Sequence, residues 1–305
     1  MNDHDSAYTS LVEAEDDARW AFGTSFDDPL AGVDTTLPDD VDPSTLAVYC
    51  LMLGDDALVS AQRLAEWSTR APELEEEVAL ANIGLDLLGQ ARLLLARAAA
   101  ADPPGVPALP EGSPVPDEDA LAFFRDEGAF RNVRLTEQDN GDFARSTARL
   151  LVFSTWRLAL LQRLTSSRDA VLAAVAAKGV KEMTYHRDYA ARWVVTLAGG
   201  TDESRRRMEQ GLVVVWPYVE ELFWSHPVEV TLAEQGVGVD PGNLRAEFDS
   251  VLAAVLGAGD LEVPQVSTAT TVAGRAGRNG VHSESLGPLL AQMQVVARAH
   301  PMGRW

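Results

Sequence analysis

Four long helical segments, arranged in two pairs, constrain the fold of this chain more than any other feature of its sequence. They cover about residues 44–68, 73–97, 143–165 and 168–198. Each carries apolar side chains at helical spacing, and within each pair the connection is a short turn. Alternating strand patterns are missing, apart from a candidate extended segment at 263–272. The pattern therefore predicts an all-α fold, a four-helix bundle with additional helices at both ends.

Shorter helices are expected outside the four long segments. One is predicted at about 117–131, and another at 201–223, which Pro217 should kink or divide because proline interrupts the hydrogen bonds of a helix interior. Two more are predicted at 240–257 and 284–299.

Residues 1–41 form an acidic arm that differs from the rest of the chain. They contain eleven acidic residues but only one arginine, Arg19, and no lysine. Such a segment is solvated and partly disordered, with at most one helix, near 11–22. Asp42-Pro43 then supplies a capping residue and a proline at the first helical position. We therefore predict an arm at 1–41 and a helical domain at 42–305.

Charge and cysteine content narrow the choice of partners and compartment. Lysine and arginine number 25 and aspartate and glutamate 46, which gives a net charge of −21. A chain this acidic repels phosphate backbones and anionic lipid headgroups, so no nucleic-acid or membrane partner is expected. The single cysteine, Cys50, excludes an internal disulfide and suits a reducing compartment. Since the N-terminal sequence shows no secretion signal, a cytoplasmic location is expected.

The histidines decide whether such a bundle could carry two iron ions. A ferritin-like di-iron site takes a carboxylate from each of two helices and a Glu-x-x-His motif from each of the other two, because residues three apart share a helix face. The histidines are His4, His186, His226, His282 and His300, and none has a glutamate three positions before it. The sequence therefore predicts no metal site and no catalytic residue in this chain.

A basic, glycine-rich segment lies at 274–280. It contains Arg275 and Arg278 among three glycines. A plain, flexible surface loop is the simpler interpretation, and contact with an anionic group such as a phosphate is the other.

One polar stripe stands out in the second long helix. Asn82, Asp86 and Gln90 lie four residues apart within an otherwise apolar run, so they share one side of the helix. The stripe is either a narrow solvated face or a buried polar network in the bundle core. In the second case the helix at 168–198 would supply the partners, from Glu182, Tyr185, His186 and Tyr189.

Several longer motifs resemble one known family. They are LGDDAL at 53–58, APELE at 71–75, ALANIGLDLLGQAR at 79–92, NGDFA at 140–144, Lys181-Glu182 with Tyr185-His186, GTDES at 200–204, Leu212 with Trp216-Pro217, and the C-terminal His282, Glu284, Met293-Gln294, Pro301 and Trp305. From about residue 45 to the end, the chain is similar to the PaaC-type subunits of bacterial phenylacetyl-CoA oxygenases, the ring 1,2-epoxidases.

The resemblance implies a ferritin-like helical subunit that is structural and not catalytic. In that family it pairs with a homologous catalytic subunit, which holds the di-iron centre and binds the CoA thioester. A separate reductase, with FAD and an iron–sulfur cluster, delivers electrons from NADPH. The complex inserts one oxygen atom into the aromatic ring of phenylacetyl-CoA, and no cofactor is expected in this chain itself.

The resemblance also places the remains of a metal site. By comparison with the catalytic relative, the six ligand positions fall on Asp86 and Gly89, on Met183 and His186, and near Ala57 and Ser154. Two of the six positions, Asp86 and His186, therefore keep a residue that could bind a metal.

A hydrogen bond between Asp86 and His186 in the bundle interior follows from this placement. A buried carboxylate that has lost its metal is costly unless another group pairs with it, and an imidazole can donate to it. The network would be completed by side chains from the set Asn82, Gln90, Lys181, Glu182 and Tyr185.

Three functions are compatible with these observations. The first is a structural subunit that binds a catalytic partner, and the second is a catalytic di-iron oxygenase, which the missing Glu-x-x-His motifs disfavour. The third is a CoA-ester-binding accessory module that keeps a pocket where the metal was lost. For the first, we expect exposed apolar faces, with Phe123, Phe124 and Phe130 and the segment 216–224 as candidates. A homo-oligomer is a further option.

Overall fold

The structure, a computed structural model, describes residue 30 and residues 32–303. The chain divides into two compact units, Met1–Gly32 and Val33–Trp305, and every helix named below belongs to the second unit. The predicted acidic arm at 1–41 therefore lies mostly outside the described residues, and the predicted helix near 11–22 lies outside them entirely.

Ten α-helices and several short 3₁₀ turns make up the regular structure of the described residues. The helices are α2 (Pro43–Trp67), α3 (Leu74–Ala101), α4 (Asp117–Phe123), α5 (Arg134–Glu137), α6 (Phe143–Leu164), α7 (Ala170–Ala198), α8 (Asp202–Val215), α9 (Pro227–Glu234), α10 (Arg245–Ala258) and α11 (Leu286–Ala299). No strand occurs between residues 32 and 303, where 263–272 is irregular apart from an isolated bridge between Val272 and Arg275. The predicted all-α class is confirmed.

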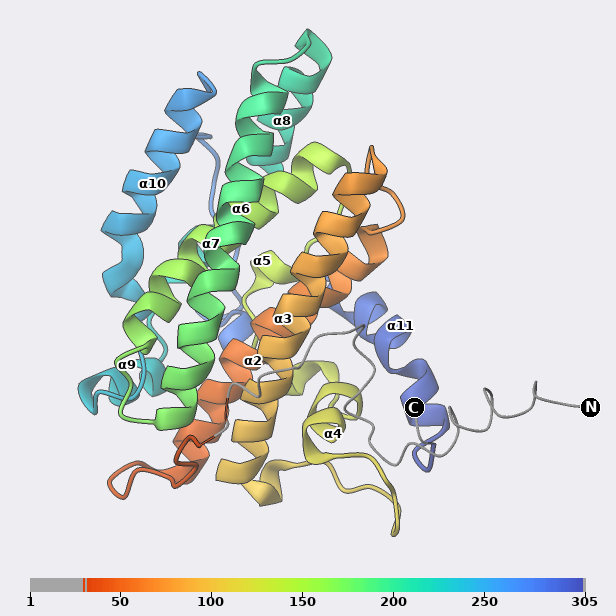
Figure 1. The fold of residues 1–305 in the computed structure, drawn as a ribbon, viewed down its shortest axis with the longest axis vertical. Coiled ribbons are helices and arrows are strands. Elements are labelled where there is room, and N and C mark those ends of the chain that lie inside the picture. The colour runs from red at the N-terminus through yellow and green to blue at the C-terminus, as the bar shows by residue number, and fades with distance from the viewer. Residues whose placement is uncertain (1–29, 31, 304–305) are drawn as a thin grey trace, which may run out of the picture. The chain divides into compact units, whose positions relative to one another are not determined.

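Two helical hairpins form the bundle predicted from the sequence. In the first, α2 packs along α3, and in the second, α6 packs along α7 (Figure 1). The hairpins meet where α3 contacts α7, while α8 and α10 pack on α6. This arrangement of four long helices is consistent with the ferritin-like class.

Aspartates set the start of three of the four long helices. The carboxylate of Asp42 accepts a hydrogen bond from Thr45 N at 2.8 Å, and Pro43 occupies the first helical position. Asp142 caps α6 in the same way, and Asp169 caps α7. These caps satisfy backbone N–H groups that have no partner within their helix.

The core of the bundle surrounds α6, which is buried on almost every side because α7, α8 and α10 pack around it. Trp156 and Arg157 on α6 are among the largest fully buried side chains of the described residues. Cys50 on α2 is also buried. A fully buried arginine in the middle of such a core is unusual.

The shorter helices differ from their predicted limits. The predicted helix at 117–131 ends at Phe123, and α8 ends at Val215, directly before the 3₁₀ turn Trp216–Tyr218 that contains Pro217. Proline explains the second limit, since it cannot donate the next helical hydrogen bond. The helices α5 and α9 were not predicted, because four and eight residues are too few for a helical period to stand out.

The candidate partner faces named from the sequence are wrong in their details. Phe130 is fully buried and Phe123 and Phe124 are half-buried. Within 216–224, Val219, Glu221 and Leu222 are buried, Trp224 is exposed, and the other residues are half-buried. Phe130 packs against the Arg125 guanidinium, whose carbon lies 4.3 Å from the ring centre. Phe130 is therefore not available to a partner, whereas Trp224 stays exposed.

The helix α3 has more apolar residues than its packing against other helices buries. By length and composition alone, α2 and α3 are both apolar enough to cross a membrane. The most apolar stretch of α2 is 72% buried, as expected of a core helix, but that of α3 is only 44% buried. A large part of the apolar surface of α3 is therefore exposed, which is uncommon without a partner.

Candidate functional site

The surviving pair of ligand-type residues joins α3 to α7. His186 Nε2 lies 3.0 Å from Asp86 Oδ2, which is the contact that the sequence predicted. The imidazole is fully buried, but 38% of the Asp86 side chain is exposed. The pair therefore lies at the edge of the bundle, with the imidazole inside and the carboxylate partly in contact with solvent.

A chain of hydrogen-bonded side chains crosses the interior of the bundle, one turn further along α3. Arg157 Nε on α6 donates to Gln90 Oε1 at 3.0 Å, and Gln90 Nε2 donates to Glu182 Oε2 on α7 at 2.9 Å. Lys178 lies 3.5 Å from the other oxygen of Glu182. Three of the four long helices are thus linked through one amide side chain.

Arg157 places a positive charge inside the bundle. Its side chain is fully buried, and burial lowers the pKa of the guanidinium to about 10, although Asp56 opposes the shift. The group therefore remains charged at neutral pH. Its two terminal nitrogens have no hydrogen-bond partner among the described residues.

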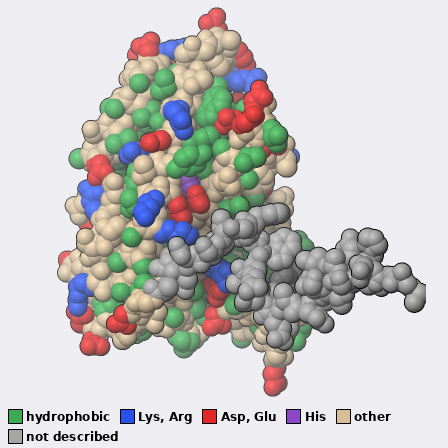
Figure 2. Space-filling view, in the orientation of Figure 1, with side chains coloured by type: hydrophobic (Ala, Val, Ile, Leu, Met, Phe, Trp, Pro, Cys, Tyr) green, Lys and Arg blue, Asp and Glu red, His purple; other side chains and the backbone are tan. Residues whose placement is uncertain are grey.

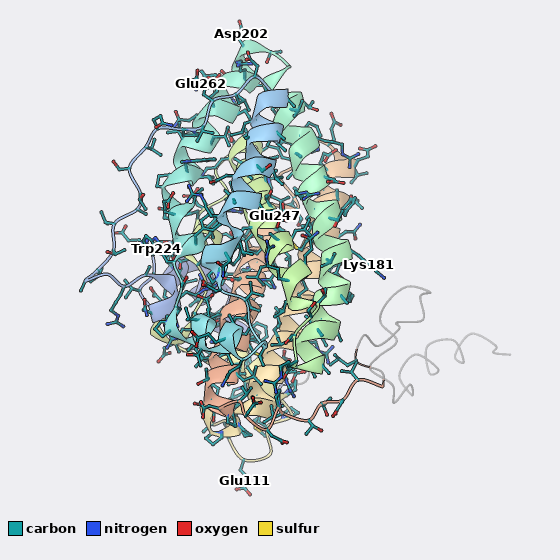
Figure 3. The ribbon with its side chains drawn as sticks, turned by 90° about the vertical axis from the view of Figure 1, so that its left-hand side faces the viewer. Glu111, Lys181, Asp202, Trp224, Glu247 and Glu262 are labelled. Carbon is teal, nitrogen blue, oxygen red and sulfur yellow. The ribbon has the colours of Figure 1, made fainter. Side chains whose placement is uncertain are left out.

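The other members of the predicted network are at the surface. Asn82, Lys181 and Tyr185 are exposed, so the expected single buried network is wrong in these three residues (Lys181 is labelled on the outer side of α7 in Figure 3). The reason is helical geometry. At about 100° per residue, a step of four residues advances about 40°, so a stripe that begins outside at Asn82 turns inward by Gln90.

The other four positions that the resemblance assigned to metal ligands do not supply ligands for a di-iron centre. Gly89 has no side chain, Met183 and Ala57 are buried and apolar, and Ser154 donates its hydroxyl to the Leu150 carbonyl of its own helix at 2.6 Å. Within the described residues no three His, Cys, Asp or Glu side chains come close enough to share a metal ion. Since iron in such sites needs several carboxylates and imidazoles, these residues do not fit a di-iron centre.

Sequence reasoning missed a cluster of buried ion pairs beneath the basic segment 274–280. Arg278 donates to both oxygens of Asp56, at 3.0 and 2.9 Å, and its Nε lies 3.6 Å from Glu229. Asp55, the residue next to Asp56, pairs with Arg125. Two adjacent aspartates within an apolar helix were the signal that could have revealed this cluster.

The segment 274–280 is accordingly not the flexible loop that the sequence predicted. Arg278 is buried, and Gly277 and Gly280 are packed so closely that an added Cβ would lie 2.0 Å from the Asn132 carbonyl oxygen and 2.3 Å from that of Gly128. Gly280 also has a φ of +71°, which favours glycine. Only Arg275 of the two arginines stays exposed.

Glu229→Gln is expected to make stability less dependent on pH. Burial raises the pKa of Glu229 from 4.5 to about 7, although Arg278 opposes the shift. Between these values the folded chain binds the proton more tightly than the unfolded chain, so the free energy of unfolding falls as pH rises, by about 3 kcal/mol in all. Glutamine cannot ionise, and urea unfolding at pH 5 and pH 8 should show a smaller fall in the variant.

The matched control is Glu234→Gln, which changes an exposed residue of the same helix. Its pH dependence should equal that of the unmodified chain. Equal pH dependence in Glu229→Gln and the unmodified chain would contradict the prediction.

Comparison with known proteins identifies the family of the chain. Residues 32–305 match the phenylacetic acid catabolic protein family. The chain belongs to this family. It is also similar to one of the subunits of the 1,2-phenylacetyl-CoA epoxidase of Escherichia coli (strain K12). The two are 44% identical over 260 residues, which cover 85% of this chain and 99% of the relative.

The match to the phenylacetic acid catabolic protein family covers nearly all of the residues that the structure describes. The match begins at residue 32, close to the division between the two compact units and before the predicted domain start at 42. Residues 33–41 are indeed attached to the helices: Arg97 Nη1 donates to the Thr35 carbonyl at 2.6 Å, and Arg168 pairs with Asp40.

Proposed function

We propose that this chain is the non-catalytic, structural subunit of a multicomponent phenylacetyl-CoA 1,2-epoxidase in aerobic phenylacetate degradation. A homologous subunit would hold the di-iron centre, and a reductase with FAD and an iron–sulfur cluster would pass electrons to it from NADPH. The role of this chain is to bind and support the catalytic subunit, in the cytoplasm.

The residues in the interior of the bundle are the main support for this proposal. A ferritin-like bundle binds iron through carboxylates and imidazoles that point inward from its four long helices. Here the buried centre holds Met183, Ser154 and the cationic Arg157, and the carboxylate–imidazole pair between α3 and α7 lies at the edge. A fixed positive charge in a medium of low dielectric constant also opposes the binding of a metal cation.

The similarity to one subunit of a 1,2-phenylacetyl-CoA epoxidase supports the same role, since it extends over nearly the whole of both chains. A chain that has the fold of an iron-binding bundle without its ligands retains the outer surfaces of that fold. A structural subunit needs such surfaces to bind its catalytic partner.

Two alternatives remain. A catalytic di-iron oxygenase subunit is disfavoured by the residues at the bundle centre. A CoA-ester-binding accessory module would need a pocket, and the hollow beside Leu87 and Phe153 offers about 20 Å³, room for one water molecule. The surface hollow of about 320 Å³ that Trp224, His226 and Arg275 line is the feature that favours a ligand-binding role (Trp224 is labelled in Figure 3).

Co-expression with the catalytic homologue from the same organism tests the proposal. We expect the two chains to co-purify as one species on size exclusion at micromolar concentration, with iron in the homologue and epoxidase activity that needs both chains and the reductase. Separate peaks, or full activity of the homologue without this chain, would refute a structural role. Calorimetry of this chain alone with phenylacetyl-CoA tests the accessory-module alternative.

A further inference from the structure

An exposed apolar stripe runs along α3. It consists of Leu74, Val78, Leu85 and Leu88, whose side chains are between 46% and 70% exposed. At about 100° per residue, these four positions fall within an arc of about 80° on one side of the helix. Figure 2 shows hydrophobic side chains gathered on the face that Figure 1 presents, bordered by acidic side chains.

A hollow of about 310 Å³ adjoins the N-terminal part of the stripe, between α3 and α7. Its walls include Tyr185, Tyr189 and Trp193, and Glu76 lines it from α3. Tyr189 Oη and Trp193 Nε1 both donate to Glu76, the second at 2.8 Å. Both donors are neutral, so neither places a positive charge beside the Glu76 carboxylate.

No cation pairs with Glu76 among the described residues. Arg192 lines the same hollow, but its Nε donates to the Asp188 carbonyl. Aromatic faces around an unpaired carboxylate are a suitable site for an ammonium or guanidinium group, which such rings attract through their negative faces. The hollow thus suits a lysine or arginine side chain.

The residues around the stripe also favour a positively charged partner. Glu73, Glu75 and Glu77 lie with Glu76 at its N-terminal end, and the whole chain has a net charge of −21. This charge disfavours a second copy of the chain, and it disfavours an anionic lipid surface for the same reason. A partner that is basic at this point is favoured.

We propose that the α3 stripe and the adjoining hollow are the docking surface for the catalytic homologue. That subunit lays an apolar helix face on Leu74, Val78, Leu85 and Leu88 and inserts one lysine or arginine side chain into the hollow against Glu76. This inference rests on the proposed function and adds the surface and the chemistry of the partner.

Titration of the labelled catalytic homologue with variants of the full chain tests the stripe. Leu85→Asp should weaken binding by at least about 30-fold, because a charge is buried in an apolar interface centre. Val295→Asp is the matched control, since Val295 on α11 is 59% exposed and lies outside the stripe. It should bind as the unmodified chain does. Circular dichroism of each variant verifies that the fold is intact.

Glu76→Gln tests the hollow separately. Glutamine keeps the shape and can still accept from Tyr189 and Trp193, so only the charge is lost. Binding should weaken by about fivefold to tenfold, and the affinity should depend less steeply on salt. Glu75→Gln, an exposed change in the same turn, should alter affinity by less than about twofold.

The outcomes separate the two proposals. If the unmodified chain binds the homologue and Leu85→Asp binds equally well, the docking surface is wrong and the proposed function stands. If the unmodified chain forms no complex at all, the proposed function fails and the surface falls with it. Self-association or binding to phosphatidylcholine vesicles that Leu85→Asp abolishes would assign the stripe to a second copy or to a bilayer, and would overturn this inference.

Discussion

Arg278→Leu is expected to lower the free energy of unfolding by about 3–5 kcal/mol, the range for a buried ion pair that loses one member. Arg278 makes two hydrogen bonds to Asp56, and it also donates to the Met52 and Arg131 carbonyls. Removal of the guanidinium leaves the fully buried carboxylate of Asp56 with one hydrogen bond from the described residues, from the Val133 N–H at 2.8 Å, while Arg157 acts on it only through its charge. Urea unfolding at pH 7 measures the loss.

The pH dependence of this loss identifies its cause. Burial raises the pKa of Asp56, and Arg278 opposes that shift. Without Arg278 the carboxylate should protonate at a higher pH, so the variant should be less destabilised at pH 5 than at pH 8. A purely steric defect would cost the same at both.

Two further variants complete the test. Arg275→Leu removes the exposed arginine of the same segment and should change stability by less than about 0.5 kcal/mol. Asp56→Leu combined with Arg278→Leu should recover most of the loss, because the uncompensated charge is gone. A loss below about 1 kcal/mol in Arg278→Leu alone would show that the pair does not hold the C-terminal segment on α2.

The purified chain is expected to bind no stoichiometric iron, even after anaerobic loading with ferrous ion. Of the six ligand positions that the family resemblance implies, only Asp86 and His186 have a side chain that could bind a metal, and these two bond to each other at 3.0 Å. Loss of a carboxylate or imidazole at the other four leaves too few ligands for a hard cation. Metal analysis after gel filtration measures the outcome, and about two irons per chain with an oxo-bridge absorption band would contradict it.

A variant in which two ligand residues are restored tests this prediction more strictly. Gly89→His with Met183→Glu recreates two carboxylate-x-x-histidine pairs, and an added Cβ at position 89 meets no atom within 4 Å. We expect this double variant to bind ferrous ion poorly while Arg157 remains, because the buried guanidinium repels a cation. Addition of Arg157→Met should raise iron uptake. Equal uptake with and without Arg157 would show that ligand loss alone excludes the metal.

Much of the fold could be predicted from the sequence because helix formation is encoded locally. The apolar spacing in 44–68 and 143–165, the caps at Asp42 and Asp142, and the interruption at Pro217 each act within a few residues of where they occur. The missing Glu-x-x-His motif is local in the same sense, since both of its residues would lie on one turn. The all-α class and the absence of a standard iron-binding motif therefore follow from the sequence alone.

Only the tertiary structure decided which polar residues enter the core and which apolar residues stay outside. Asp56 and Arg278 are 222 residues apart and meet because the C-terminal segment returns to α2. Gln90 faces inward and Asn82 outward because the helix rotates between them, and Leu85 is exposed because no described helix covers that side of α3. The periodicity of a helix specifies relative directions around its axis, but the direction that faces the core is set by the packing of the other helices.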